Sequence, residues 1–429
     1  MSHGQVIMEK ELDATVRAAG AGRRRAGSLR RAGVGVVLSA GLLGLLGLGG
    51  AGPARATPCE ASSWPLWQDF NKHFVTADAR VLAANTPARD SFSEAQSYAM
   101  FFALVANDQP MFDRLWRWSL QNLAAGDLAN KLPAWHWGRA ADNSWGVLDA
   151  NSASDADLWF AYALLEAGRL WQRPDLSADG RQLLANVVRQ EVIKLPGLGA
   201  MLLPGPYGFI QADGSWRLNP SYLPLPLLRR FALEAPDGPW NEIAANTVKM
   251  IKASAPKGFA PDWVSYRAPA GRKASFDVDP VAGPTGSYDA IRVYLWAGMT
   301  ASDDPLAGAL LKALPGMSWR TPRNAVPPEK VSARNGVAHG HGPYGFSAAL
   351  LPYLQLTATR EIQTQQTERA RTLQALSLQP ERLAKAAPSY YDHVLSLFGL
   401  GWTENRYQFM SNGQVQLKWQ KTCIPTHTN

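Results

Sequence analysis

Apolar residues recur with helical spacing over most of the chain. From about residue 93 to 402, apolar segments of helical length alternate with loops rich in Gly, Pro and Asn. Apolar positions three and four residues apart predict helices that bury one face, and Gly and Pro mark their ends. The clearest predicted helices are Ser93–Asn107, Pro110–Ala124, Asp155–Trp171, Ala178–Ile193, Trp240–Ala253, Tyr288–Met299, Gly345–Leu356 and Ser389–Gly401. Successive helices joined by loops favour an α/α architecture.

Strand patterns are confined to short pieces. Polar and apolar residues alternate only in stretches such as 207–218 and 407–419, which predicts a few small strands. No segment of linker-like composition divides residues 57–429. We therefore expect a single all-α domain of roughly a dozen helices.

The basic character of the chain is concentrated at its N-terminus. The formal charge is +8, but residues 1–56 hold eight Lys and Arg against three acidic residues, a surplus of +5 that leaves +3 on residues 57–429. With 46% apolar residues, the chain can bury a large core. The charge therefore gives no reason to expect a nucleic-acid partner.

Residues 1–56 have the pattern of an export signal. An Arg-rich stretch ending at Arg31 precedes an uncharged run over 32–52, and Ala54-Arg55-Ala56 is an A-x-A cleavage pattern. We predict a signal peptide cleaved after Ala56 and a periplasmic or secreted domain over 57–429. The uncharged run is also long enough for an uncleaved membrane anchor, and the pair Arg30-Arg31 leaves the export route open between the twin-arginine and ordinary secretory pathways.

Two cysteines lie near opposite ends of the exported part, Cys59 and Cys423. An oxidising compartment favours a disulfide between them. Neither has the basic neighbours of a reactive thiol, so the sequence favours this bond over a catalytic cysteine.

Three acidic positions stand at the predicted starts of apolar helices. Glu94 follows Ser93, which has the pattern of an N-cap, and partial burial there would suit a general acid. Asp155, with Asp157 two residues later, begins another helix, where Ser154 or Asp155 is a potential cap. Asp289 has Arg292 three residues later on the same helical face, close enough to hold its carboxylate ionised. A protonated acid and an ionised base are the two halves of glycosidase chemistry.

Aromatic residues favour a carbohydrate ligand. The chain has 16 Trp and 12 Tyr, and flat pyranose faces stack on aromatic rings. Trp135, Trp137 and Tyr222 lie in predicted loops and are assigned to a substrate groove, whereas Trp116 and Trp118 follow a helical pattern and are assigned to the core.

Motifs for other chemistries are missing from the sequence. There is no H-E-x-x-H, G-x-S-x-G or P-loop pattern. His339 and His341 share a Gly-rich loop, which alone does not make a metal site. We expect neither a metal nor a cofactor.

Longer motifs resemble the family 8 glycoside hydrolases, and within that family the periplasmic endoglucanases encoded with bacterial cellulose synthase. The most specific is A-S-D-A-D-L-W-F-A-Y-A-L-L-E-A-G-R-L-W at 153–171, with Phe160 where Ile or Met is usual. The other matching stretches are 93–104, 195–205, 219–224, 255–264 and 287–296. The resemblance runs from about Trp64 to Trp402 and implies an (α/α)6 barrel with an open substrate cleft.

The resemblance also implies roles for these residues. Glu94 would protonate the leaving glycosidic oxygen, Asp289 would activate water on the opposite face, and Asp155 would hold the distorted sugar. Asp155 is the alternative base, because the family signature has been described in that way. Arg292 and Tyr222 would orient the base and the water.

The implied function is an inverting endo-β-1,4-glucanase, a cellulase that acts on β-1,4-glucan chains in association with the cellulose synthase machinery. Two other functions stay open. One is hydrolysis of another β-glucan or of chitosan, since family members share the acid and differ elsewhere. The other is a non-catalytic component that guides the glucan, which the presence of all three carboxyl groups and Arg292 disfavours.

Overall fold

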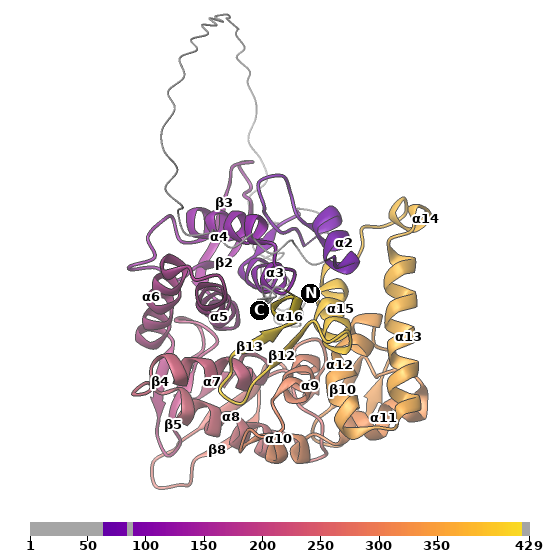
Figure 1. The fold of residues 1–429 in the computed structure, drawn as a ribbon. Coiled ribbons are helices and arrows are strands. Elements are labelled where there is room, and N and C mark those ends of the chain that lie inside the picture. The colour runs from indigo at the N-terminus through magenta and orange to yellow at the C-terminus, as the bar shows by residue number, and fades with distance from the viewer. Residues whose placement is uncertain (1–62, 84–88, 423–429) are drawn as a thin grey trace, which may run out of the picture.

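The computed structural model describes residues 63–83 and 89–422, and the ribbon is shown in Figure 1. The helices are α2 (Pro65–Phe74), α3 (Ser93–Val105), α4 (Gln109–Leu123), α5 (Ser154–Leu170), α6 (Pro174–Gln190), η1 (Pro220–Tyr222), α7 (Leu225–Glu234), α8 (Trp240–Ser254), α9 (Ala290–Met299), α10 (Ala307–Ala313), α11 (Gly316–Asn324), α12 (Tyr344–Thr357), α13 (Arg360–Ser377), α14 (Pro380–Leu383), α15 (Tyr390–Thr403) and α16 (Lys418–Thr422).

The strands form small antiparallel sheets between the helices. They are β1 (Ser91–Phe92), β2 (Ala134–Arg139), β3 (Trp145–Ser152), β4 (Val192–Leu195), β5 (Gly199–Leu202), β6 (Trp216–Leu218), β7 (Val264–Arg267), β8 (Ser275–Val278), β9 (Thr285–Gly286), β10 (Lys330–Ser332), β11 (Ala338–His339), β12 (Tyr407–Phe409) and β13 (Val415–Leu417). Their orders are β1-β2-β3, β4-β5, β6-β7-β8, β11-β10-β9 and β12-β13.

The helices form two concentric rings. The inner helices α3, α5, α7, α9, α12 and α15 pack successively against one another. The ring closes where Tyr98 of α3 meets Phe398 of α15, with their ring centroids 5.1 Å apart. Helices α4, α6, α8, α10, α13 and α2 each pack on the outside of one inner helix, in that order. This arrangement confirms the predicted (α/α)6 barrel.

Sequence pattern decides which ring a helix joins. Every residue of α9 is buried, and in α3 every residue except Glu94 is buried. By contrast, the outer helix α13 buries only Gln366, Ala370 and Gln374 among its 18 residues. A helix that is apolar on all sides is stable only when it is surrounded, whereas one with a single apolar stripe suits a surface.

Aromatic rings fill the middle of the barrel. Trp159 of α5, Trp296 of α9 and Phe398 of α15 lie with their ring centroids 5.2 to 5.4 Å apart. Phe101 of α3 packs on Trp159 at 4.9 Å. These tilted and edge-to-face contacts are the favoured geometries for aromatic pairs, so the interior is a packed core and not a channel.

The C-terminal hairpin of β12 and β13 covers one end of the barrel and lies across the middle of the ring in Figure 1. Tyr407 packs against Phe101 at 5.2 Å. Beyond the hairpin, Trp419 donates its indole N–H to the Leu104 carbonyl at 3.0 Å. Because Leu104 is near the C-terminal end of α3, the hairpin closes the end where the inner helices finish, and their N-terminal ends lie at the other.

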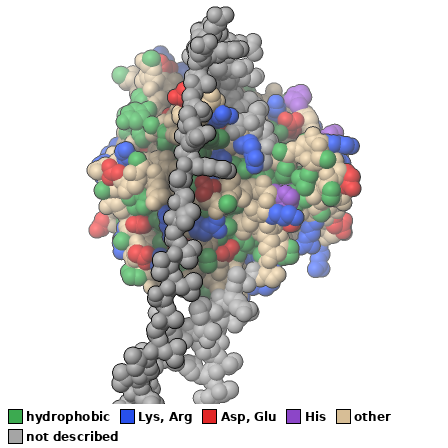
Figure 2. Space-filling model, turned by 90° about the horizontal axis from the view of Figure 1, so that it is seen from above, with side chains coloured by type: hydrophobic (Ala, Val, Ile, Leu, Met, Phe, Trp, Pro, Cys, Tyr) green, Lys and Arg blue, Asp and Glu red, His purple; other side chains and the backbone are tan. Residues whose placement is uncertain are grey.

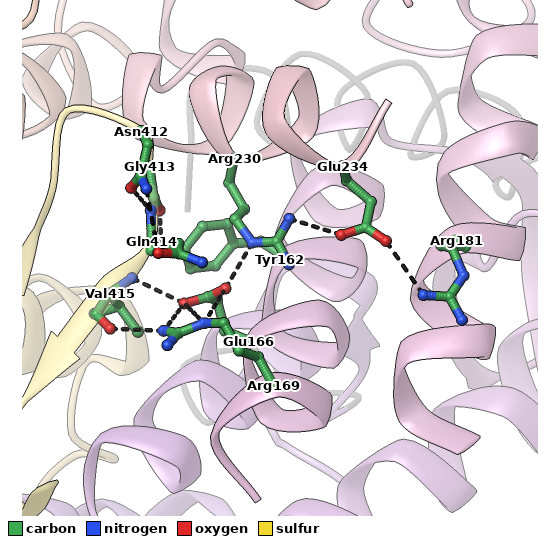
Figure 3. A network of polar contacts seen from close by, with 10 residues as sticks. All are labelled: Tyr162, Glu166, Arg169, Arg181, Arg230, Glu234, Asn412, Gly413, Gln414 and Val415. Atoms are coloured by element: carbon green, nitrogen blue, oxygen red, sulfur yellow. Dashed lines mark hydrogen bonds and ion pairs between the residues drawn. The ribbon is translucent and has the colours of Figure 1, made fainter. Parts of the chain in front are cut away.

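A buried ionic network fixes that hairpin to the barrel (Figure 3). Glu166 of α5 is fully buried and accepts hydrogen bonds from Arg230 Nε at 2.6 Å, Arg169 Nε at 3.1 Å and the Val415 N–H at 2.8 Å. Arg230 also donates to Glu234 at 2.9 Å. A buried carboxylate with this many charged and polar donors is compensated for the loss of water.

Several elements differ from the sequence-based expectations. Helix α6 begins at Pro174, because Pro fits the first turn, and it ends at Gln190 because Val192–Leu195 pairs with β5. The hairpin of β2 and β3 was not predicted, since its residues do not alternate cleanly and its pairing contains register shifts.

Among residues 63–83 and 89–422, no helix is long and apolar enough to cross a bilayer. The uncharged run at 32–52, the cleavage pattern at Ala56 and both cysteines, Cys59 and Cys423, lie outside the described residues. On the face shown in Figure 2, basic and acidic side chains are interspersed.

Replacing Glu166 by Gln keeps the side-chain size but removes the charge that faces Arg169 and Arg230. We expect the free energy of unfolding to fall by about 3 kcal/mol, because a buried guanidinium loses its counter-charge. Urea denaturation measures this loss. Asp175→Asn, which breaks an exposed pair with Arg173, is the control and should cost less than about 1 kcal/mol. Equal losses in the two variants would contradict a special role for the network.

Candidate active site

The three candidate carboxyl groups meet at the N-terminal end of the inner ring. Glu94 is in the first turn of α3, Asp155 is in the first turn of α5, and Asp289 is the residue before α9. Because the N-terminal ends of the inner helices meet at one end of the barrel, residues that are far apart in the sequence are brought to one place.

Arg292 joins the three carboxyl groups. Its Nη1 contacts Glu94 Oε2, and its Nη2 lies 3.0 Å from Asp289 Oδ1 and 3.7 Å from Asp155 Oδ2. The predicted contact between Asp289 and Arg292 is therefore present. The Arg292 side chain is 1% exposed, and that of Glu94, the most accessible of the four, is 12% exposed. Glu94 is thus partly buried, as expected for the candidate acid.

Burial and crowding alter the protonation of Asp155. Loss of solvent, followed by the nearby charge of Glu94, raises the pKa of Asp155 well above its usual value, and Arg292 only partly opposes this. The Arg292 guanidinium is itself stabilised in its charged form. Although burial disfavours the charge, neighbouring tyrosines and the carboxylates of Glu94 and Asp289 raise its pKa well above the usual value.

Neither expected helix cap is formed. Phe92 precedes α3 and Ser93 is its first residue, without a side-chain hydrogen bond to the backbone. Ala153 precedes α5, and Asp155 Oδ1 accepts only from the adjacent Ala156 N–H, at 2.8 Å. The capping predictions for these helices were wrong, and the Asp155 carboxyl group is directed towards Arg292.

Trp135 and Trp137 are half-buried residues of strand β2, where the sequence had predicted a loop. Strand β2 pairs with β1, which directly precedes helix α3, so that Trp137 lies opposite Ser91. The Trp135 ring stacks on Phe92 at 5.6 Å. Both tryptophans therefore lie beside the start of α3, which carries the candidate acid.

Trp137 belongs to a larger aromatic group on this sheet. Trp145 of β3 stacks on it at 5.3 Å, and the side chain of Trp145 is 49% exposed. The guanidinium of Arg80 lies 5.0 Å from both rings. Trp118 meets Trp137 edge to face and is itself buried, as predicted for the core.

Tyr222 lies at the end of the short helix η1, and its ring centroid is 5.8 Å from the Arg292 guanidinium. Burial and the charges of Asp155 and Asp289 raise the pKa of its phenol well above the usual value. The hydroxyl group therefore keeps its proton, which allows Tyr222 to donate a hydrogen bond to a neighbouring oxygen.

Sequence reasoning missed several neighbours of Arg292. Ser221 accepts a hydrogen bond from Nη2 at 3.0 Å. Tyr391, at the start of α15, places its ring 5.9 Å from the guanidinium and donates its hydroxyl to the Tyr288 carbonyl at 2.6 Å. Tyr391 stands in an apolar helical pattern that is typical of core residues. Tyr391 differs from those core residues only in its position on α15, which places its ring beside Arg292.

Two more carboxyl groups are buried close to each other near this site. Asp157 of α5 and Glu191, at the end of α6, are both fully buried, and Ser152 donates its hydroxyl to Glu191 Oε1 at 2.7 Å. Burial raises the pKa of Glu191 to about 8, and burial with the charge of Glu191 raises that of Asp157 well above its usual value. Near neutral pH this pair therefore retains at least one proton.

The described part of the chain has no group of three or more His, Cys, Asp or Glu side chains arranged to hold a metal ion. The site instead offers carboxyl groups of different accessibility around one cation, together with a phenol and half-buried indoles. Such a set suits acid–base hydrolysis of a sugar polymer.

Comparisons with known proteins agree with this chemistry. The model of glycosyl hydrolases family 8 matches residues 56–405. An endoglucanase of Pseudomonas fluorescens strain SBW25 is 48% identical over 384 residues, covering 87% of this chain and 95% of that protein. An endoglucanase of Xanthomonas axonopodis pv. citri strain 306 is 47% identical over 87% of this chain and 94% of its own. The crystal structure of an endo-1,4-D-glucanase from Vibrio fischeri ES114 matches with a TM-score of 0.77 at 41% identity, over 83% of this chain and all of that one.

The buried pair of Glu191 and Asp157 predicts that stability decreases as the pH rises. Because folding raises the pKa of Glu191 from 4.5 to about 8, the native state binds its proton more tightly than the unfolded chain does. The stability that this proton contributes is fully present below the pKa of Glu191 in the unfolded chain and is lost as the pH rises towards 8. When the pH rises from 5 to 8, the free energy of unfolding should therefore fall less for Glu191→Gln than for the wild type, with a difference on the order of 2 kcal/mol. Urea denaturation at pH 5 and at pH 8 measures this difference. The exposed Glu381→Gln, as control, should follow the wild type, and a Glu191→Gln curve with the wild-type slope would contradict the prediction.

Proposed function

The chain belongs to glycosyl hydrolases family 8, and we propose that this glycoside hydrolase is an endo-β-1,4-glucanase that cleaves internal bonds of cellulose with inversion at the anomeric carbon. The family resemblance drawn from the motifs is thus confirmed. The observation that carries the proposal is the convergence of Glu94, Asp155 and Asp289 on Arg292. Relatives that are 47% and 48% identical are endoglucanases, which supports the choice of substrate.

Glu94 is assigned as the general acid. It is the most exposed of the three carboxyl groups, so a glycosidic oxygen can approach it. An acid must carry a proton when it acts. The contact with Arg292 therefore has to give way to a hydrogen bond with the leaving oxygen as the glucan enters.

Asp289 is assigned as the general base in preference to Asp155. A base must be ionised, and Arg292 Nη2 at 3.0 Å from Asp289 stabilises that form, whereas the same nitrogen lies 3.7 Å from Asp155. The raised pKa of Asp155 favours its protonated form, which suits a group that donates a hydrogen bond to the bound sugar.

Inversion requires a water molecule between the base and the anomeric carbon. Tyr222, which keeps its proton and faces Arg292, is placed to donate a hydrogen bond to that water. In inverting enzymes the two carboxyl groups stand roughly 6.5–9.5 Å apart to leave this space. The intervening guanidinium, which contacts both Glu94 and Asp289, supports such a separation.

Aromatic residues give the proposed substrate its binding surface. Trp135 and Trp137 lie beside the acid, and Trp145 extends the surface along β3. Trp137 also lines a surface pocket that contains the polar side chains Arg114, Arg117, Gln121 and Asn122. Stacking on indole faces and hydrogen bonds from neighbouring polar groups match the two kinds of surface on a glucan chain.

The location and the biological role are also proposed. The Arg-rich segment, uncharged run and A-x-A pattern of residues 1–56 support export, cleavage after Ala56 and a periplasmic or secreted enzyme. The motif resemblance supports a functional association with the cellulose synthase machinery. A different β-glucan or chitosan is the alternative substrate. Comparing release of reducing sugar from carboxymethyl-cellulose, chitosan and xylan decides between them.

The assigned roles predict different effects for three isosteric substitutions. Glu94→Gln and Asp289→Asn should each lower kcat by at least about 10³-fold, because each removes a proton-transfer group, while cellopentaose still binds. Asp155→Asn should lose less kcat, because an amide still donates a hydrogen bond.

NMR of fresh cellopentaose hydrolysate should show the α-anomer first. If the β-anomer appears first, inversion is wrong. If Asp289→Asn stays active while Asp155→Asn does not, Asp155 is the base.

The aromatic surface predicts a second set of effects. Trp145→Ala should raise KM for cellohexaose about tenfold with little change in kcat, because stacking of about 1.4 kcal/mol is lost equally in the ground and transition states. Steady-state kinetics measures both constants. Trp319→Ala is the matched control, since Trp319 is 60% exposed on α11, away from β2 and β3. An unchanged KM for Trp145→Ala would exclude Trp145 from the binding surface.

A further inference from the structure

Asp262 is a buried carboxyl group that none of the steps above uses. It precedes strand β7, and its side chain is fully buried. Its Oδ1 accepts hydrogen bonds from the backbone N–H groups of Ser287 and Ala290, both at 2.8 Å. These two residues lie on either side of Asp289 in the sequence, so Asp262 binds the backbone that carries the proposed base.

Asp289 occupies a position where aspartate normally caps its own helix. An Asp at the N-cap accepts a hydrogen bond from a backbone N–H in the first turn. Asp289 makes no such side-chain bond, and its Oδ1 instead accepts from Arg292 Nη2 at 3.0 Å. The free N–H groups at the start of α9 therefore need another acceptor. Asp262, from 27 positions earlier in the chain, provides it.

The segment that carries Asp262 is fixed against α9 by its backbone. The Asp262 N–H donates to the Thr285 carbonyl at 2.8 Å, and the Ala260 N–H donates to the Tyr294 hydroxyl at 3.0 Å. Gly286 approaches the same segment so closely that a Cβ atom there would lie 2.0 Å from the Ala260 carbonyl oxygen. A segment held at both ends and in close contact leaves little freedom for Asp262 to move.

We propose that Asp262 is a positioning residue for the base: it caps helix α9 in place of Asp289, so that the Asp289 carboxylate faces Arg292 and the reacting water. The inference rests on the proposed function, which makes Asp289 the base. Asp262 touches neither substrate nor water in this scheme and acts only through the backbone of residues 287–290.

The surroundings of Asp262 indicate whether its neutral or its ionised carboxyl group caps α9. Burial, followed by the charge of Asp289, raises the pKa of Asp262 to about 7, against the opposing effect of the backbone N–H groups. In weakly acid solution the group is therefore mostly the neutral acid, which still accepts hydrogen bonds through Oδ1. Asn has the same acceptor in the same place, so it mimics this form.

Other groups near Asp289 also influence how it titrates. They are Arg292 on its own helix, Asp155 of α5, Tyr222 of η1 and Tyr391 of α15. The charge of Asp262 itself acts on Asp289 and Tyr391. Because Asp262→Ala and Asp262→Asn both remove that charge, a comparison of the two variants isolates the effect of the cap.

The test compares Asp262→Ala with Asp262→Asn. Asp262→Ala removes the acceptor, and we expect kcat on cellopentaose to fall about 100-fold with KM within about threefold of wild type, as for an ångström-scale misplacement of a catalytic group. Asp262→Asn keeps the acceptor and should retain kcat within about fivefold, with the acid limb of the kcat/KM profile at the wild-type pH. Hydrogen exchange of the peptide over 285–291 should be faster in Asp262→Ala only.

Asp304→Ala separates positioning from general loss of stability. Asp304 is also buried, and it accepts from the Leu306 N–H at 2.8 Å and from Arg229 Nε at 2.7 Å beyond the C-terminal end of α9, the opposite end of that helix from Asp289. This variant should be destabilised yet keep kcat. The inference is overturned if Asp262→Ala keeps wild-type kcat, if Asp262→Asn is as impaired as Asp262→Ala, or if Asp304→Ala loses kcat equally.

Asp289→Asn tests the proposed base independently. If it stays active, the base assignment fails, and the exchange rates of residues 285–291 still show whether Asp262 caps the helix. If Asp289→Asn is inactive while Asp262→Ala is fully active, only the positioning role fails.

Discussion

The charge of Arg292 is the constraint on which the site depends. A buried guanidinium is stable only with anionic partners, and here three carboxyl groups surround it. One positive charge cannot fully compensate three negative ones at these distances, so the carboxyl groups compete for it. Burial, followed by the charge of Glu94, raises the pKa of Asp155, and Arg292, which lies farther from Asp155 than from the other two carboxyl groups, opposes this only in part. The carboxyl groups of the site therefore differ in how readily they hold a proton, and acid–base hydrolysis requires such a difference.

The barrel supplies that geometry through the direction of its inner helices. Glu94, Asp155 and Asp289 all lie at helix N-terminal ends, where the exposed N–H groups and the helix dipole favour negative charge. The opposite end is closed by the C-terminal hairpin, and there Glu166 has enough donors to be fully compensated. The fold thus contains two ionic networks. The network around Glu166 is compensated and stabilises the barrel, whereas in the network around Arg292 three carboxyl groups share one cation, which suits acid–base chemistry.

Much of this was predictable from the sequence, and the reasons for success and failure are physical. The helical period predicted five of the six inner helices to within a few residues, because they are apolar on nearly all sides, but it missed α7, which is buried over only part of its length. The pair Asp289 and Arg292 was found because three residues span one helical turn. Contacts between distant segments were not found: Ser221 of η1 and Asp262, before β7, both contact α9, and no local pattern specifies which distant segment will lie there. The placement of Trp135 and Trp137 on a strand was missed because β2 is irregular.

The two wrong capping predictions, at Ser93 and at Ser154 or Asp155, do not share one cause. Ser93, Asp155 and Asp289 are residue types that favour helix caps, and each stands at or next to the start of an inner helix without capping it. Elsewhere Asp108 and Ser389 do cap their helices, so the local rule holds in this chain where nothing competes with it. Around Arg292 the attraction of a buried cation exceeds the roughly 1 kcal/mol that a cap contributes. At Asp155 and Asp289 the unused cap marks a place where the side chain faces the Arg292 guanidinium, whereas Ser93 does not cap α3 because it is the first residue of that helix, one position past the N-cap.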